Sequence, residues 1–239
     1  MMRELPLGRG DYVAGGAWSM PFLDLDGARR RRPLVFGEVQ LHGGASPLME
    51  EMFSGRCSSP EEWAVMWKEI GADGICLRIC PGDGPVVAAI SGRTRMPLAV
   101  SGPAEAVREA AEAVDDSSMI LMSDGEEVRA EGHYSIGSDL TMMEPTILGS
   151  NIQDAADSGR RMRMRAISSD TLGLPAVCDV TSACDSDIDG DECIRMRRTS
   201  MMEAQSALVA MLSGADIIIV RGPGAADMAR VYGEELADL

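Results

Sequence analysis

The sequence predicts an α/β barrel, and two observations carry this prediction. The chain has 239 residues, which is long enough for one α/β barrel with a single sizeable core. Eight short β-branched or apolar runs alternate along it with helical patterns, as βα units around a parallel sheet require. We therefore expect one TIM (β/α)8 barrel domain over residues 1–239, with residues 1–32 as an N-terminal extension leading into the first strand.

The predicted strands are short apolar runs bounded by turn residues. They cover Leu34–Leu41, Gly74–Cys80, Pro97–Ser101, Ser118–Ser123, Leu140–Glu144, Arg163–Ser168, Pro175–Val180 and Asp216–Arg221. The last run, ADIIIVRG, is continuously apolar, and Gly222 and Pro223 close it. Such a run is typical of a strand that is buried on both faces.

Capping residues and apolar periodicity indicate three helices. Ser59-Pro60-Glu61-Glu62 has the capping serine, early proline and early acids of a helix start, and Trp63, Met66, Trp67 and Ile70 follow at helical spacing. Further helices are expected at Pro103–Val114 and at Met201–Leu212, the latter ended by Gly214. The connections Pro81–Met96 and Ser169–Leu174 look too short for a full crossover helix, so we expect a trimmed barrel.

The charge balance limits the classes of partner. The chain carries 38 acidic and 22 basic side chains, for a formal net charge of -16. A nucleic-acid backbone or an anionic membrane would be repelled by most of such a surface. Lys68 is the single lysine and lies in a helical pattern, which disfavours lysine-based covalent chemistry. We expect neither nucleic acid nor membrane as a partner.

Cysteine usage and the N-terminal residues indicate the compartment. The 6 cysteines contain no CxxC pair and are expected to be reduced thiols, so no iron-sulfur or zinc site is predicted. No stretch approaches the length of an apolar transmembrane span, and Arg3, Glu4 and Arg9 interrupt the place of a signal peptide. A cytoplasmic protein is the expectation.

The candidate binding residues are polar groups predicted at the carboxyl ends of strands, where barrel enzymes build their sites. They are Glu38, Arg78, Ser101, Ser123, Glu144, Asn151, Asp179 and Arg221. Asp179 and Glu38 are of a type that can act as acid or base, but nothing in the pattern distinguishes a catalytic residue among them. The catalytic residues therefore remain unassigned at this level.

Three further motifs each have a functional and a structural interpretation. The acidic stretch Asp185–Asp191 has the spacing of a calcium loop but Met196 at the twelfth position, which favours a solvated loop over a cation site. Gly222-Pro223-Gly224 stands where many barrels bind phosphate, and a strand-to-helix turn explains it equally well. Of the two histidines, His42 follows the first strand, and neither it nor His133 belongs to a recognisable nucleophile motif.

Five stretches of the chain, taken in order, resemble one protein family. They are VAGGAWSMPFLDLDG (Val13–Gly27), RPLVFGEVQ (Arg32–Gln40), EEWAVMWKEIGADGICLRI (Glu61–Ile79), MPLAVSG (Met96–Gly102) and MEAQSALVAMLSGADIIIVRGPGAADMARV (Met202–Val231). The family is the delta subunit of acetyl-CoA decarbonylase/synthase, also known as the small subunit of the corrinoid iron-sulfur protein. The chain departs from it after the sixth predicted strand, where the short Ser169–Leu174 replaces a G-Y-G-x-E-Y stretch and its helix.

The resemblance implies a barrel similar to that of dihydropteroate synthase. It also implies a heterodimer with a large gamma subunit, which in the family carries the corrinoid and the iron-sulfur cluster, and it is compatible with membership of the wider acetyl-CoA synthase complex. In the family this pair carries a methyl group on cobalt between a tetrahydropterin and the acetyl-CoA synthase site. A tetrahydropterin is thus a possible second ligand, in a pathway of one-carbon metabolism such as the Wood-Ljungdahl pathway or methanogenesis.

Three hypotheses about function follow. The first is a delta-subunit-like component of corrinoid-dependent methyl transfer, in which the barrel mouth orients the reactants and excludes water. The second is an autonomous pterin-binding methyltransferase, in which Asn151 and Asp179 would hold the pterin. The third is a non-catalytic scaffold subunit, suggested by the short connections and the acidic surface.

Overall fold

The computed structural model describes residues 4–15, 31–114, 117–136, 141–143, 175–185 and 191–238. These residues group into two compact units. The central unit comprises Pro6–Val13 and Phe36–Ser138, and the C-terminal unit comprises Met1–Leu5, Ala14–Val35 and Asp139–Leu239. The prediction of a single domain over residues 1–239 stays a prediction.

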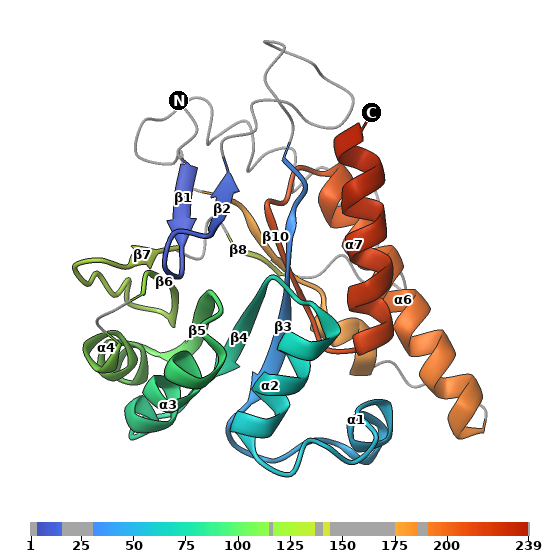
Figure 1. Cartoon of the computed structure of the whole chain (residues 1–239), viewed down its shortest axis with the longest axis horizontal. Coiled ribbons are helices and arrows are strands. Elements are labelled where there is room, and N and C mark those ends of the chain that lie inside the picture. Colours follow the sequence, from blue (N-terminus) through green and yellow to red (C-terminus); the bar gives the residue numbers. More distant parts are fainter. Residues whose placement is uncertain are drawn as a thin grey trace. The chain divides into compact units, whose positions relative to one another are not determined.

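The central unit is built on parallel strands with helices between them. Its strands are β3 (Leu34–Gln40, of which the first two residues belong to the C-terminal unit), β4 (Gly74–Arg78), β5 (Leu98–Pro103), β6 (Met119–Asp124) and β7 (Tyr134–Ser135), paired in that order. Its helices are α1 (Pro47–Met52), α2 (Pro60–Ile70), α3 (Gly84–Thr94) and α4 (Ala104–Ala113). Figure 1 shows α2, α3 and α4 beside one another along these strands. The β7 strand lies in a connection where no strand was predicted.

Helix α2 begins and ends as its sequence predicts. The Ser59 hydroxyl accepts a hydrogen bond from the Glu62 N–H at 3.2 Å, and Pro60 occupies the first turn. Gly71 ends the helix with a φ of 87°, a left-handed conformation that favours glycine. Trp63 and Trp67 are buried on the inner face of the helix. The periodic spacing of apolar residues thus placed the helix and its core face correctly.

The prediction that Pro81–Met96 is too short for a full crossover helix was wrong, because α3 runs for 11 residues from Gly84 to Thr94. Its sequence contains glycine and β-branched residues of low helix propensity, which hid it. Tertiary packing compensates, since Val87 and Ile90 are fully buried. A Cβ at Gly84 would lie 3.2 Å from the Glu109 carbonyl oxygen, so glycine allows α3 to approach α4 closely.

The two faces of the central strands are distinguished by close packing at Gly37. A Cβ there would lie 2.0 Å from the Trp67 ring, so Gly37 faces α2. Because side chains alternate along a strand, Glu38 projects from the opposite face. The Trp67 indole N–H donates to the Glu38 carbonyl oxygen at 2.8 Å, which ties the helix to the strand at this position.

The C-terminal unit holds three parallel strands among its described residues. They are β8 (Thr141–Met143), β9 (Val177–Asp179) and β10 (Ile217–Val220), with β9 between the other two. All four residues of β10 are buried, as the apolar run predicted. The Leu34 N–H at the start of β3 donates to the Asp216 carbonyl oxygen at 2.9 Å. The predicted strand Arg163–Ser168 and the connection Ser169–Leu174 lie outside the described residues.

Two long helices complete this unit. Helix α6 spans Glu192–Leu212 and follows a short 3-10 turn, η2 (Thr181–Asp185), while α7 spans Pro223–Asp238. Figure 1 shows α6 and α7 running beside each other. Helix α6 starts well before the predicted Met201 because the Asp191 carboxylate caps it, accepting from the Ile194 N–H at 2.9 Å. Asp191 was predicted to belong to the acidic loop, of which residues 186–190 lie outside the described ranges.

The N-terminal extension contains a small sheet that the sequence did not predict. Strands β1 (Glu4–Leu7) and β2 (Tyr12–Gly15) pair with each other. In the central unit, Gly8 and Ser118 exchange two main-chain hydrogen bonds of 3.0 and 2.9 Å, directly before β6. The turn after β1 is therefore anchored at the amino-terminal end of β6.

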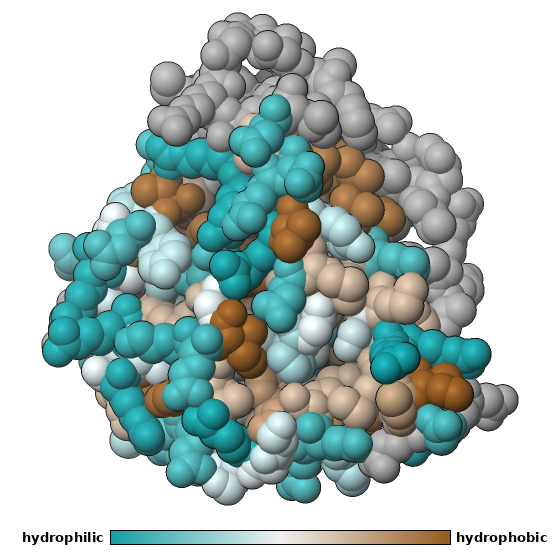
Figure 2. Space-filling model, turned by 45° about the vertical axis from the view of Figure 1, so that its right-hand side comes forward, coloured by the Kyte–Doolittle hydropathy of each residue, from teal (hydrophilic) through white to brown (hydrophobic). Residues whose placement is uncertain are grey.

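The described surface has few large apolar side chains. Ile194, Met201 and Val231 are exposed, and on the face drawn in Figure 2 strongly hydrophobic residues occur in small groups among hydrophilic ones. Within the described ranges, no helix is both long enough and apolar enough to cross a membrane. All six cysteines lie among the described residues, and none of them forms a disulfide there.

Candidate functional site

Three of the predicted site residues meet at the carboxyl ends of β3, β4 and β5. The strand register pairs Gln40 with Arg78, and Arg78 with Ser101, so these positions lie in one row across the sheet. The Arg78 Nε donates to Glu38 Oε1 at 2.8 Å, and its Nη1 donates to the Ser101 hydroxyl at 3.1 Å. One guanidinium therefore joins the two neighbouring strands to its own. We call Glu38, Arg78 and Ser101 the mouth cluster.

The mouth cluster is a charged group in a buried setting. The Glu38 side chain is 2% exposed and the Arg78 side chain 29% exposed. A carboxylate removed from water to this extent requires a close cation and further hydrogen bonds. Gln40 adds a contact to Glu38 Oε2 at 3.4 Å. The guanidinium is thus held at fixed orientation while part of it reaches solvent, an arrangement suited to binding a planar carboxylate, carbonyl or phosphate group.

A histidine and an aspartate lie in the loops that follow the same two strands. The Leu41 N–H donates to the Arg78 carbonyl oxygen at 3.2 Å, which holds the residues after β3 beside the end of β4. The His42 Nε2 lies 2.8 and 3.0 Å from the two carboxylate oxygens of Asp83. The Cys80 N–H in turn donates to Asp83 Oδ2 at 2.7 Å. Sequence analysis singled out His42 but missed Asp83. The clue to Asp83 was its position between Gly82 and Gly84, in the turn after β4.

Ser123 lies at the carboxyl end of β6 but projects from the other face of the sheet. Its register partner is Gly102, which follows Ser101, so Ser123 is out of phase with the mouth cluster. Its hydroxyl donates to the Glu126 carbonyl oxygen and accepts from the Val128 N–H at 3.3 Å. These bonds close the turn after β6, which gives Ser123 a local structural role.

The C-terminal unit contains two other predicted site residues. Asp179 ends β9, and its Oδ1 accepts from the Thr181 N–H at 3.0 Å and from the Thr181 hydroxyl at 2.7 Å. Arg221 follows β10, and its main-chain N–H donates to the carboxyl group of Glu203. The remaining two residues, Glu144 and Asn151, lie outside the described residues.

Glu203 on α6 is a buried carboxyl group that sequence analysis missed. It is fully buried and accepts hydrogen bonds from the N–H groups of Arg221 and, at 2.8 Å, Gly222. Burial raises the pKa of Glu203 to about 8, although these two hydrogen bonds, that of the Cys184 side chain and the Arg221 charge all act to lower it. The sequence does contain a clue to this burial: Glu203 is four residues before Ala207, so the two lie on the same apolar face of the predicted helix.

These contacts favour the structural interpretation of Gly222-Pro223-Gly224. The N–H groups of Arg221 and Gly222, at the start of this motif, already bind an internal carboxyl group. Because both N–H groups already donate to Glu203, neither is available to a bound phosphate. Glu203 thus anchors the strand-to-helix turn at the first residue of this motif.

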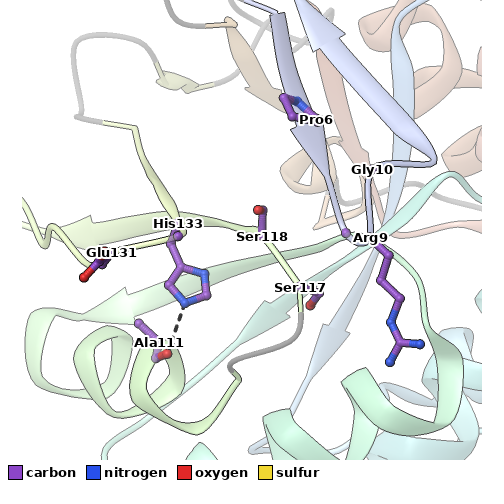
Figure 3. Close-up of a pocket in the computed structure, with 10 residues that line it drawn as sticks. Pro6, Arg9, Gly10, Ala111, Ser117, Ser118, Glu131 and His133 are labelled. Carbon is purple, nitrogen blue, oxygen red and sulfur yellow. Dashed lines mark hydrogen bonds between the residues drawn. The ribbon is translucent and has the colours of Figure 1, made fainter.

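A cavity of about 460 Å³ opens in the central unit at the other end of the strands, before β6 (Figure 3). Its lining consists of Pro6, Gly8, Arg9, Gly10, Ala111, Ser117, Ser118, Glu131, Gly132 and His133. The His133 Nδ1 accepts from the Met119 N–H at 3.2 Å and its Nε2 donates to the Ala111 carbonyl oxygen at 3.1 Å. Both ring nitrogens of His133 therefore bind main-chain groups. In α/β barrels the amino-terminal end of the strands serves stability, which is the role that this cavity lining fits.

The described residues contain no cluster of three or more His, Cys, Asp or Glu side chains that could hold a metal ion. The polar residues at the strand ends are instead arranged as pairs, namely Glu38 with Arg78 and His42 with Asp83. Such pairs bind and orient polar organic groups and exchange protons. The described mouth is thus suited to an organic ligand with hydrogen-bonding edges.

Comparison with known proteins shows the fold. The chain is similar to dihydropteroate synthase from Xanthomonas albilineans with 4-aminobenzoic acid, with a TM-score of 0.51 and 14% identity over 85% of this chain and 93% of that one. It is similar to dihydropteroate synthase from Yersinia pestis, with a TM-score of 0.51 and 13% identity over 87% of this chain and 94% of that one. The Yersinia pestis protein with a pterine-sulfa conjugate has a TM-score of 0.50 and 13% identity over 85% and 92%.

The chain has a dihydropteroate synthase-like α/β fold. The predicted fold class, a trimmed α/β barrel of the dihydropteroate synthase type, is therefore confirmed. No family model matches the sequence, and no curated protein matches it either.

Proposed function

We propose that this chain is a pterin-binding, delta-subunit-like component of corrinoid-dependent methyl transfer. The observation that carries the proposal is the mouth cluster, a buried Glu38–Arg78 pair bonded to Ser101, on a fold shared with a synthase that binds a pterine conjugate. The ordered sequence resemblance to the delta subunit family adds the corrinoid-bearing partner. We include in this proposal that the protein is located in the cytoplasm.

The mouth cluster would bind the ligand by its polar edge. A pterin ring presents a carbonyl oxygen and ring nitrogens in one plane, and the part of the planar, charged Arg78 guanidinium that reaches solvent is the group that would face such an edge. Because Glu38 and Ser101 already hold Arg78, its orientation costs little on binding. The buried surroundings of Glu38 exclude water from the rear of the guanidinium. The residues would thus orient a methyl donor rather than attack it.

The corrinoid would belong to the large partner subunit. When bound there, it supplies the cobalt that accepts the methyl group. This chain would orient the methyl donor and exclude water from it. Neither task requires a side chain to act as a nucleophile. The described residues fit that limited role, since they form organic-ligand pairs and no metal-binding cluster.

Titration calorimetry with a tetrahydropterin under anaerobic conditions tests the pterin site. The chain should bind the ligand, and Arg78→Met should weaken binding at least tenfold because the oriented donors are lost. The matched control is Arg93→Met, which removes an exposed arginine from α3 and should leave binding unchanged. If Arg78→Met fails to fold, the double variant Glu38→Gln/Arg78→Met removes both buried charges and should fold without binding.

Binding that is equal in wild type, Arg78→Met and Arg93→Met would overturn the mouth cluster as the site. Absence of binding by folded wild type would overturn the pterin proposal altogether.

An anaerobic pull-down from native extract, followed by an absorbance spectrum of the eluate, tests the partner. A large subunit with corrin and iron-sulfur bands is the expected result. A colourless eluate that still binds tetrahydropterin would overturn the corrinoid partner and favour the autonomous methyltransferase. Recovery of that partner by a chain unable to bind any pterin would favour the scaffold subunit.

A further inference from the structure

His42 and Asp83 form a pair that the mouth cluster does not use. His42 is two residues beyond the end of β3, and Asp83 immediately precedes α3. The His42 Nε2 lies 2.8 Å from Asp83 Oδ2, and the side chains are 56% and 12% exposed. Asp83 is thus buried behind an imidazole ring that reaches solvent. A ring in this position can contact a ligand while the carboxylate stays protected.

The hydrogen bonds determine which nitrogen of His42 faces outward. An ionised carboxylate is only an acceptor, so Nε2 carries the proton that both Asp83 oxygens accept. In the neutral ring, Nδ1 is then a proton acceptor. Among the described residues, Nδ1 of His42 has no hydrogen-bond partner. It is therefore available to a ligand.

Asp83 is itself held from behind. Its Oδ2 accepts from the Cys80 N–H at 2.7 Å, and its carbonyl oxygen accepts from the N–H groups of Val86 and Val87 in the first turn of α3. The carboxylate therefore cannot rotate freely away from His42. On the other side of the pair, Gly43 and Gly44 have φ values of 86° and 69°, so the chain turns sharply directly after His42.

The pair lies at the same sheet edge as the mouth cluster. Leu41, next to His42, donates its N–H to the carbonyl oxygen of Arg78. Charged groups on the adjoining elements include Glu38 and Arg78 from β3 and β4, which pair with each other, and Glu109 from α4, which accepts from the Gly82 N–H at 2.6 Å. Cys80, in the loop that also holds Asp83, is exposed. His42 thus lies in the loop that directly follows β3, the strand that carries Glu38.

From this geometry we propose that His42 is the acid–base residue of the mouth and that Asp83 is its positioning residue. The inference rests on the proposed function, because the ligand is taken to be a pterin. The step is a proton transfer: a ligand N–H bond breaks as an Nδ1–H bond forms, the electron pair stays on the ligand nitrogen, and the imidazolium positive charge faces Asp83. The reverse step returns the proton, and no oxidant or further reactant is needed.

The pairing explains why a carboxylate stands behind this histidine. A carboxylate bonded to one N–H of an imidazole fixes the ring tautomer and stabilises the imidazolium form. The same pairing in catalytic triads does not transfer the second proton. We therefore expect Asp83 not to take the proton from His42 and to act only through the orientation and charge of the imidazole.

Proton exchange on ligand binding tests the proposal. Calorimetry of tetrahydropterin binding in buffers of different ionisation enthalpy measures the number of protons that are exchanged. Wild type should exchange protons, with an affinity that varies by up to about tenfold per pH unit. His42→Gln should remove this exchange and flatten the pH profile. Asp83→Asn, which keeps the side-chain shape, should reduce the exchange while tetrahydropterin still binds.

The second histidine provides the matched control. His133→Gln changes an imidazole bonded to the main chain before β6, and it should leave proton exchange as in wild type. Nitrogen NMR of the free protein adds a reading that needs no ligand: with only 2 histidines present, His42→Gln assigns both rings. The His42 ring should carry its neutral-state proton on Nε2 and should change its signals in Asp83→Asn.

Three outcomes overturn different parts of this proposal. Tetrahydropterin binding with the same proton exchange in wild type and His42→Gln overturns the role of His42 and leaves the proposed function standing. Absence of binding by folded wild type overturns the proposed function together with this inference. A His42 ring protonated on Nδ1 in the neutral free protein overturns the pairing itself.

Discussion

Two buried glutamates, one in each unit, have opposite environments. Glu38 in the central unit faces a guanidinium, and Glu203 in the C-terminal unit faces two main-chain N–H groups. Both are almost completely buried. Burial raises the pKa of Glu203 to about 8, so its carboxyl group is largely protonated near neutral pH. The difference shows that the same residue type can hold a cation at an open mouth or anchor a closed turn, according to what faces it.

The largest expected effect is a pH dependence of stability that comes from Glu203. Its pKa rises from 4.5 in the unfolded chain to about 8 in the folded one. Between these values the folded state holds a proton that the unfolded state has released, so stability falls as pH rises. The fall should approach about 1.4 kcal/mol per pH unit. Urea unfolding of wild type across this window measures it.

Glu203→Gln is the variant that isolates this contribution. Glutamine does not titrate, so the slope between pH 4.5 and 8 should flatten. The variant should also be less stable at low pH, because the amide NH2 cannot accept from both Arg221 and Gly222. An unchanged slope in Glu203→Gln would assign the pH dependence to other groups.

Breaking the Glu38–Arg78 pair tests how strongly the buried Glu38 depends on its cation. Arg78→Met leaves a buried carboxylate without its cation, which should lower the free energy of unfolding by about 3 kcal/mol. Adding Glu38→Gln should recover a large part of the loss, because no uncompensated charge then remains. Denaturant unfolding of the single and double variants gives the answer. A double variant no more stable than Arg78→Met would show that packing matters here more than charge.

Glycine substitutions compare the packing of the two units. Gly37→Ala should cost about 1 to 3 kcal/mol, because its Cβ would lie 2.0 Å from a Trp67 ring that is tethered to the Glu38 carbonyl oxygen. Gly224→Ala should cost less, since the nearest atom is the Ser200 hydroxyl at 3.2 Å, which can rotate away. Thermal unfolding ranks the two. Equal losses would indicate that Trp67 can move.

The smallest effects are expected at the helix caps. Ser59→Ala in the central unit and Asp191→Ala in the C-terminal unit should each cost about 1 kcal/mol. Only the Asp191 effect should weaken with added salt, because its carboxylate also interacts with the helix dipole. Unfolding at two ionic strengths distinguishes them. A salt-dependent Ser59→Ala would contradict the assignment.

The sequence predicted most of the strands correctly and part of the candidate site. Seven of the eight predicted runs overlap β3, β4, β5, β6, β8, β9 and β10, because buried strands require continuous apolar runs, and the eighth lies outside the described residues. It placed Glu38, Arg78 and Ser101 at strand ends, and their register brought them together. It could not separate Ser123 from them, because a one-residue difference in register moves a side chain to the opposite face.

Local pattern by itself determined the caps of α2, the buried face of Trp63 and Trp67, and the apolar β10, since these depend on residues close in the chain. The tertiary structure alone decided that α3 forms, that Asp83 meets His42, and that Glu203 reaches Gly222. These contacts join residues up to 41 positions apart. Periodicity reports which face of an element is buried, whereas only packing decides which buried or loop residue lies opposite it.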